Sequence, residues 1–306
     1  MRKQAGRILV LLCLYLPLGC IQAAPLAVTV VLSEHGGPYQ EFSDALREKL
    51  IKKNIYLDIV DEADEVNPGQ GMVVAVGMKA AAAVAGSGAR AILNVLVPET
   101  GHEKLLRDHP QRAASKAYSA IFLDQPTERQ VRLIAAMLPG KRQVGVLFDS
   151  FSPDELAELK QRMAMHGLSL HEHKIGADFP LHIALQHILD NSEVLLALPD
   201  AAIYNSSTIR NILLASYRSG DPVIGFSPAY VKAGALAAVF TTPAQIAEQT
   251  ARFIQQYGET RTLPSAQHPQ LFEIAVNEQV GRSLGLAVRS AEELVQEISA
   301  IAGDAR

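Results

Sequence analysis

The sequence predicts an α/β fold of two lobes, each a doubly wound parallel sheet, joined by a hinge. Short runs of aliphatic and β-branched residues alternate with amphipathic segments, and the connections between them are short. Most of the apolar runs lack the polar–apolar alternation of half-exposed strands, which is typical of strands buried on both faces of a parallel sheet. Strand and helix in regular alternation indicate sheets covered by helices on both faces.

Each predicted element has its own local signal. Ten apolar runs are expected to be strands: residues 27–32, 55–60, 72–76, 91–95, 119–123, 143–148, 169–173, 194–198, 223–226 and 236–240. Apolar residues three and four positions apart predict helices over residues 39–53, 127–138, 153–166, 179–189, 202–219 and 243–257. Pro126, Pro153 and Pro243 stand near the first turn of three of these helices, where the absence of an N–H is tolerated.

Three crossings between the lobes are expected, near residue 138, between residues 231 and 236, and within residues 260–270. They predict a first lobe of residues 25–138 plus 236–262 and a second lobe of residues 139–235 plus 263–306. A single doubly wound domain of this length is the alternative that the pattern leaves open.

Residues 1–24 have the three-part layout of a secretory signal peptide. A basic start with Arg2, Lys3 and Arg7 precedes an apolar core at residues 8–18 and a run of small or polar residues at 19–24. The apolar core is shorter than the roughly 20 residues that span a bilayer. The sequence therefore predicts export to the periplasm, with either conventional cleavage near Ala23 or Ala24 or lipidation of Cys20, since residues 16–20 resemble a lipobox in part.

Composition excludes several classes of function. Both cysteines, Cys13 and Cys20, lie in the predicted leader, so the mature chain has no disulfide and no thiol nucleophile. A net charge of −4 without a basic stretch argues against nucleic acid as a partner. No serine lies in a Gly-x-Ser-x-Gly elbow, and no glycine pattern matches a nucleotide fingerprint or a phosphate loop. His171 and His173 share a strand face without an evident third metal ligand. We expect no catalysis, no metal and no cofactor.

The candidate ligand-binding residues follow predicted strands. In open parallel sheets, ligands bind beyond the carboxyl ends of the strands. Small hydroxyls, helix starts and an aromatic ring in these loops suit a small polar ligand, although serines there also serve as helix caps. The predicted ligand-binding residues are Ser33, Glu34, Gly77, Met78, Pro98, Asp149, Ser150, Asp200, Ser227 and Tyr230.

Three blocks resemble one protein family. They are residues 120–147 (AIFLDQPTERQVRLIAAMLPGKRQVGVL), 222–236 (PVIGFSPAYVKAGAL) and 275–286 (AVNEQVGRSLGL). Together they resemble the substrate-binding proteins of ABC transporters, typified by the aromatic-amino-acid-binding lipoproteins. The resemblance implies the type I periplasmic-binding fold, with two α/β lobes, a three-stranded hinge and a ligand held in the cleft. Residues 92–104 depart from the family pattern, which leaves the identity of the ligand open.

The resemblance implies an exported solute-binding protein that clamps a small polar ligand, an amino acid or similar, and presents it to an ABC permease. The alternative is a periplasmic sensor of the same fold that acts on a membrane signalling partner. Neither has a catalytic activity.

Overall fold

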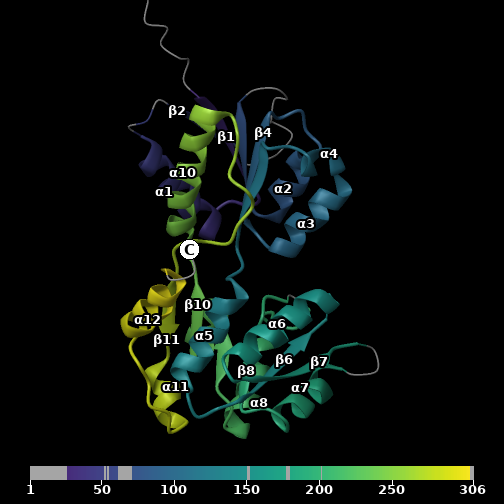
Figure 1. Ribbon diagram of the computed structural model, residues 1–306, viewed down its shortest axis with the longest axis vertical. Helices are drawn as coiled ribbons and strands as arrows, with labels where there is room; N and C mark the ends of the chain where they lie inside the picture. Colours follow the sequence, from purple (N-terminus) through teal and green to yellow (C-terminus); the bar gives the residue numbers. More distant parts are fainter. Residues whose placement is uncertain are drawn as a thin grey trace, which may run out of the picture.

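The computed structural model describes residues 26–51, 53, 55–60, 71–149, 152–176, 180–200 and 202–303. The predicted signal peptide with Cys20, and the candidate Ser150, lie outside the described residues. The described chain forms two α/β lobes, one above the other in Figure 1, as the sequence predicts.

The first lobe is built on a five-stranded parallel sheet in the order β2-β1-β3-β4-β5. Its strands are β1 (Leu26–Leu32), β2 (Ile55–Val60), β3 (Met72–Val76), β4 (Ala91–Val97) and β5 (Tyr118–Phe122). Helices α1 (Gly37–Leu50) and α10 (Pro243–Thr260) pack on one face. Helices α2 (Met78–Ala85) and α3 (Glu99–Asp108) pack on the other, and the short α4 (Pro110–Ala113) follows. Although α10 comes late in the chain, it lies beside α1 (Figure 1).

The second lobe contains a six-stranded sheet in the order β11-β10-β9-β8-β6-β7. Its strands are β6 (Gln143–Phe148), β7 (Ser169–Lys174), β8 (Val194–Leu196), β9 (Val223–Gly225), β10 (Ala237–Phe240) and β11 (Glu273–Val276), of which β11 alone is antiparallel to its neighbour. One face carries α5 (Thr127–Met137), α6 (Pro153–Met165) and α12 (Ala291–Gly303), and the other carries α7 (Leu181–Leu189) and α8 (Ile209–Ser219). The short helices α9 (Pro228–Ala233) and α11 (Glu278–Ser283) stand at the strand ends.

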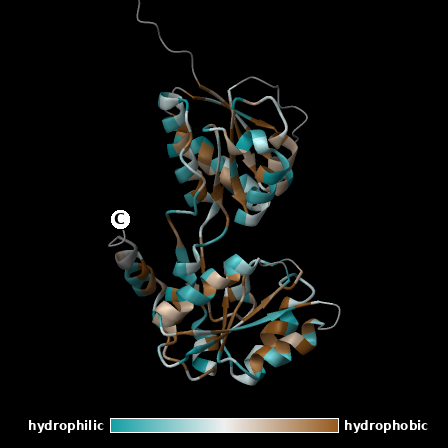
Figure 2. Cartoon of the chain, turned by 45° about the vertical axis from the view of Figure 1, so that its right-hand side comes forward, coloured by the Kyte–Doolittle hydropathy of each residue, from teal (hydrophilic) through white to brown (hydrophobic). Residues whose placement is uncertain are grey.

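Hydrophobic burial accounts for this layering. Figure 2 shows the hydrophobic colour concentrated on the strands and the inner faces of the helices. The strands β3, β4 and β5 are buried along their whole length, as the absence of alternation predicts. Within the described ranges, no helix is long and apolar enough to cross a membrane.

Three segments connect the lobes. The first is residues 123–126, between β5 and α5; the second is residues 241–242, between β10 and α10; the third is residues 261–272, between α10 and β11. The third segment first runs beside β5, where Gln267 donates its N–H to Ala120 O and accepts from Phe122 N–H. Only afterwards does it enter the second lobe.

The lobe boundaries differ from the predicted ones at each crossing. Helix α5 packs into the core of the second lobe, so the first crossing precedes residue 127 instead of following residue 138. Strand β10 pairs with β9 in the second sheet, so the second crossing follows residue 240 instead of residue 235. Residues 263–267 pair with β5 in the first lobe. The amphipathic pattern of a helix or strand is the same whichever lobe it packs in. The pattern alone therefore does not show where the chain crosses between the lobes.

Candidate functional site

Two cavities lie where the lobes meet. One, of about 150 Å³, is lined by Pro98 and Glu99 from the first lobe and by Glu155 and Leu198 from the second. The other, of about 370 Å³, extends along the second and first crossings toward α9. Four residues, Asp124, Gln125, Gln130 and Pro199, line both cavities. The two cavities are therefore parts of one cleft, and its floor is the first crossing.

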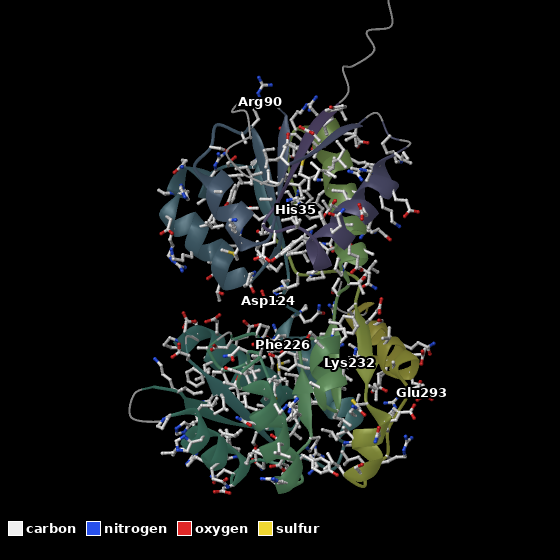
Figure 3. The ribbon with its side chains drawn as sticks, turned by 180° about the vertical axis from the view of Figure 1, so that it is seen from behind. His35, Arg90, Asp124, Phe226, Lys232 and Glu293 are labelled. Carbon is white, nitrogen blue, oxygen red and sulfur yellow. The ribbon has the colours of Figure 1, made fainter. Side chains whose placement is uncertain are left out.

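Asp124 lies at the centre of this floor, between the two lobes (Figure 3). Its Oδ2 accepts the backbone N–H of Glu99, the first residue of α3, at 2.6 Å. Burial raises the pKa of Asp124 above its usual value, and this N–H offsets part of that effect. The carboxylate thus has one firm backbone donor in the first lobe and faces both cavities.

Glu99 enters the cleft because β4 ends irregularly. Leu96 adopts a left-handed φ of 53°, and the register of β4 with β5 shifts between Val95 and Val97. Such β-bulges re-aim the residues that follow. Glu99 then pairs with His268 of the third crossing, whose Nε2 lies 3.2 Å from Glu99 Oε2. This hydrogen bond holds the pKa of Glu99 below its usual value.

The three crossings are held together by a hinge network, which consists of Gln125, Arg129 and Thr241 with the carbonyls of Pro269 and Leu271. Gln125 Nε2 donates to Thr241 Oγ1 at 2.8 Å, and Thr241 Oγ1 donates to Leu271 O at 2.7 Å. Arg129 Nη1 donates to Gln125 Oε1 at 2.6 Å and to Pro269 O at 3.3 Å.

The hinge network also includes a cation–π contact and a partly buried positive charge. The guanidinium of Arg129 stacks over the ring of Phe272, 4.2 Å from its centroid. Burial lowers the pKa of Arg129 to about 10, which still leaves it charged at neutral pH. Each crossing therefore contributes a group to one connected set of hydrogen bonds beneath the cleft.

A family model for the ABC transporter substrate-binding proteins matches residues 122–291, which is more than half of the chain. The match spans the first crossing, the whole second sheet and the third crossing. The chain belongs to this family. The resemblance seen in the sequence is thereby confirmed, and the protein is a binding protein of a family whose members take small ligands.

Solved structures show the same fold at low identity. The chain is similar to a conserved domain protein from Vibrio cholerae, with 22% identity and a TM-score of 0.57 over 89% of this chain and 98% of the other. It is similar to an ABC domain in complex with L-Trp from Streptococcus pneumonia, with 17% identity and a TM-score of 0.60 over 89% and 98%. It is also similar to the ligand-free, open structure of a substrate-binding protein with adhesive properties from Clostridium difficile, with 15% identity and a TM-score of 0.68 over 87% and 97%. No curated protein sequence matches the chain.

In this binding protein, the strand-end residues of the first lobe pack inward. Ser33 is buried, and its Oγ accepts the N–H of Ala80 in the first turn of α2 at 3.0 Å, which is the capping alternative. Gly77 has a φ of 87°, and a Cβ there would lie 2.6 Å from Ser33 Oγ and 2.8 Å from the ring of Tyr39. Met78 lies against Gly101 of α3. None of them lines either cavity.

The other predicted residues divide between the cleft and its surroundings. Pro98 lines the smaller cavity and Ser227 lines the larger one. Glu34 and Asp149 are exposed in turns outside both cavities. Asp200 ties two loops of the second lobe together, since its carboxylate accepts N–H groups of Asp149 and Ala202, each at 3.0 Å.

Tyr230 turns away from the cleft. Its hydroxyl donates to the carbonyl of Tyr204 at 2.8 Å, and its ring packs against Phe226 with centroids 4.4 Å apart. Close contact with the backbone of Gly225 completes this packing. Phe226 itself lines the larger cavity (Figure 3), so the aromatic ring at this strand end belongs to Phe226 and not to the predicted Tyr230.

The sequence reasoning missed the residues of the cleft floor. Asp124 and Gln125 lie in the segment that follows β5, so the strand-end rule that nominated other loops could have found them. Gln130 and His268 had no comparable signal, because a helix face and an irregular crossing bring them into the cleft. In the described part of the chain, no group of three or more His, Cys, Asp and Glu side chains could hold a metal ion.

Proposed function

We propose that the protein is exported and holds a small solute between its lobes, closing over it by bending at the three crossings and presenting it to an ABC permease. The observation that carries the proposal is the cleft itself: both of its cavities are lined by residues of the second lobe and of the first crossing, and one also by the first turn of α3. A solute there would contact both lobes, and closure would remove it from water.

The proposed ligand contacts are those residues that face the cavities. Pro98 and Ser227 remain from the strand-end loops, and the crossing adds Asp124, Gln125 and Gln130. Gln130 is 4% exposed and belongs to α5 of the second lobe, so it would move with that lobe on closure. The larger cavity, at about 370 Å³, has the size of a small-molecule site.

Titration calorimetry combined with small-angle X-ray scattering tests this function. The mature protein is titrated with amino acids, amines, short peptides, sugars and purines, and the radius of gyration is measured with and without each compound that gives heat. We expect saturable binding of one chemical class and a smaller radius of gyration in the complex. Absence of binding to every compound would contradict the proposal.

The partner needs a separate experiment. Reconstituted with a candidate ABC permease from the same organism, the liganded protein should stimulate ATP hydrolysis, as recognition of a closed form requires. Binding without stimulation, together with ligand-dependent association with a membrane kinase or cyclase, would favour the sensor alternative. Cell fractionation and mass spectrometry of the mature amino terminus distinguish soluble export from lipidation at Cys20.

A further inference from the structure

The walls of the cleft carry charge of one sign. Glu99, Asp124, Glu155 and Glu158 line the smaller cavity, and Glu41 joins Asp124 in the larger one. No lysine or arginine of the described chain lines either cavity. Among the described residues, the only other titratable wall group is His268, which already pairs with Glu99. An anionic solute would enter such a cleft against repulsion, whereas a cation would be attracted.

Two arginines close to the cleft, Arg129 of α5 and Arg162 of α6, do not change this balance. Arg129 donates to Gln125 Oε1 and to Pro269 O and stacks on Phe272, so its charge is committed to the hinge network. Arg162 of α6 lies close to the carboxylates of Glu128 and Glu158. Neither guanidinium faces a cavity.

The free N–H groups in the first turn of a helix could also bind a ligand carboxylate. Several of these N–H groups already donate to oxygen atoms of the chain itself. At α3, the N–H of Glu99 is donated to Asp124. At α6 and α10, capping boxes use the first-turn donors, with Ser152 bonded to Glu155 and Thr242 to Gln245. Helices α5 and α9 begin without a side-chain cap, so their first turns are competing sites for a carboxylate, and the test below includes anions for that reason.

Asp124 is the carboxylate best placed to bind a cation. It lines both cavities, and its hydrogen bond to Glu99 N–H engages only Oδ2. No lysine or arginine of the described chain forms an ion pair with it at 4.0 Å or less. A partly buried carboxylate is stabilised by a cation that shares its site, and here that cation can come from the ligand.

The rest of the lining combines apolar side chains with the uncharged polar residues Thr100, Gln125, Thr127, Gln130, Ser227, Thr241 and Thr242. Leu159 and Leu198 flank the carboxylates in the smaller cavity. Leu123, Phe226 and Phe240 line the larger one, together with three prolines. A ligand that fills both cavities therefore meets carboxylates at the floor and hydrocarbon or ring surface along the walls.

We propose that the solute is an amphiphilic amine, with an ammonium group against Asp124 and an apolar, ring-bearing body along Phe226 and the leucines. This inference rests on the proposed function, because it names the chemical class that the same cleft selects. A zwitterionic amino acid would bring a carboxylate into the acidic cavity, and a sugar would leave the apolar walls without a matching surface.

Matched compounds isolate the charge. Tryptamine, L-tryptophan and indole-3-propionate share one ring system, and phenethylamine, L-phenylalanine and 3-phenylpropionate share a smaller one. Calorimetry with the mature protein at pH 7 should give dissociation constants for the amines at least tenfold lower than for the zwitterions, with the anions weakest. Equal or tighter binding of a zwitterion or an anion would overturn the inference.

Two variants locate the contact. Asp124→Asn keeps an oxygen for Glu99 N–H and should weaken amine binding about tenfold or more, since a hydrogen bond to a charged group is lost. Glu99→Gln changes a side chain that is half exposed and should weaken amine binding less than Asp124→Asn does. The matched control is Glu278→Gln, an exposed carboxylate on α11 outside both cavities, and thermal melting verifies that each variant is folded. Unchanged amine affinity in folded Asp124→Asn would overturn the inference.

The outcomes separate this inference from the function on which it rests. Binding of a sugar or an amino acid with closure, but of none of the amines, would leave a solute-binding protein and refute the amine. Absence of binding for every compound in both panels would refute both.

Discussion

The loops that follow the strands of the first lobe and the segments that cross between the lobes differ in what their side chains contact. Ser33 and Gly77, at the ends of β1 and β3, contact their own lobe. Asp124 and Gln125, at the end of β5, face the cleft and the hinge. The carboxyl edge of the first sheet thus carries residues that pack within their own lobe and residues that face the cleft. The carboxyl edge of the first sheet locates the cleft, but the strand-end residues that face the cleft are those at the first crossing and those at the start of α3, which follows a bulge.

A methyl group at Gly77 provides the strongest test of the packing role. The backbone there, at φ 87° and ψ 168°, lies in a region that is almost exclusive to glycine. The added Cβ would also press on Ser33 and Tyr39. Gly77→Ala should lower the free energy of unfolding by about 3 kcal/mol or more. Denaturant unfolding measures this, with Gly140→Ala as control, where nothing lies within 4 Å. A loss of unfolding free energy no larger than that of an ordinary surface substitution would contradict the packing role, because the loop would then have room for a side chain or a ligand.

Removal of the arginine from the hinge network should have the next largest effect. Arg129→Ala deletes two hydrogen bonds and the stacking on Phe272, and it leaves Gln125 Oε1 without its donor. We expect a loss of about 2 kcal/mol in unfolding free energy, and a larger radius of gyration in scattering if the crossings loosen. The control is Arg282→Ala, whose exposed ion pair with Glu278 is 3.0 Å long and should contribute less than about 0.5 kcal/mol. Equal effects of the two substitutions would contradict a special role for the network.

The sequence predicted the elements better than their assignment to lobes. Strands β2, β3 and β6 begin and end where the apolar runs do. For β3 and β6, burial on both faces leaves a signal in almost every residue. Strand β11 and helices α3, α11 and α12 were not predicted, since β11 is short and largely unburied and α3 has only two buried residues. Membership in a lobe depends on long-range contacts, such as those of α10 with α1, that no local period contains.

The candidate site was predictable to a smaller extent. Pro98 and Ser227, which were predicted from their position after a strand, line the two cavities. Gly77 and Tyr230 were nominated for the same reason, but the structure uses the first for close packing and the second for a hydrogen bond to Tyr204 O. Whether a strand-end residue faces the core or the cleft depends on the path of its loop, which residue type alone does not determine.

A further test of the comparison removes the cap that Ser33 provides. Ser33→Ala leaves the buried N–H of Ala80 at the start of α2 without its acceptor, so the unfolding free energy should fall by about 1–2 kcal/mol. The exposed Ser283, which donates to Gln279 O in α11, is the control and should change stability by less than about 0.5 kcal/mol when replaced by alanine. Weakened binding of a solute without loss of stability in Ser33→Ala would instead return Ser33 to the set of ligand contacts.

The smallest expected effect concerns a second carboxylate, at the opposite end of a strand from the cleft. Asp221 precedes β9, is 7% exposed, and its Oδ2 has no hydrogen-bond partner in the described structure. Burial raises the pKa of Asp221 to about 6, with Lys141 opposing and Glu193 assisting the rise. Unlike Asp124, it lines neither of the two cleft cavities, so no ligand in the cleft can compensate for its burial.

The sign of the effect follows from proton linkage. Between the unfolded pKa near 4 and the folded value of about 6, the folded protein binds more protons, so the contribution of Asp221 to stability falls as the pH rises through this window. Asp221→Asn removes the titration and should raise the unfolding free energy at pH 7 by about 1 kcal/mol, with the gain shrinking toward pH 4. Melting temperatures at pH 4, 5.5 and 7 measure it, against Asp190→Asn on the surface. Because Asp221 lies away from the cleft, this variant should bind solute as the natural protein does, whereas Asp124→Asn should not. A gain that is independent of pH would show that the charge of Asp221 is already compensated.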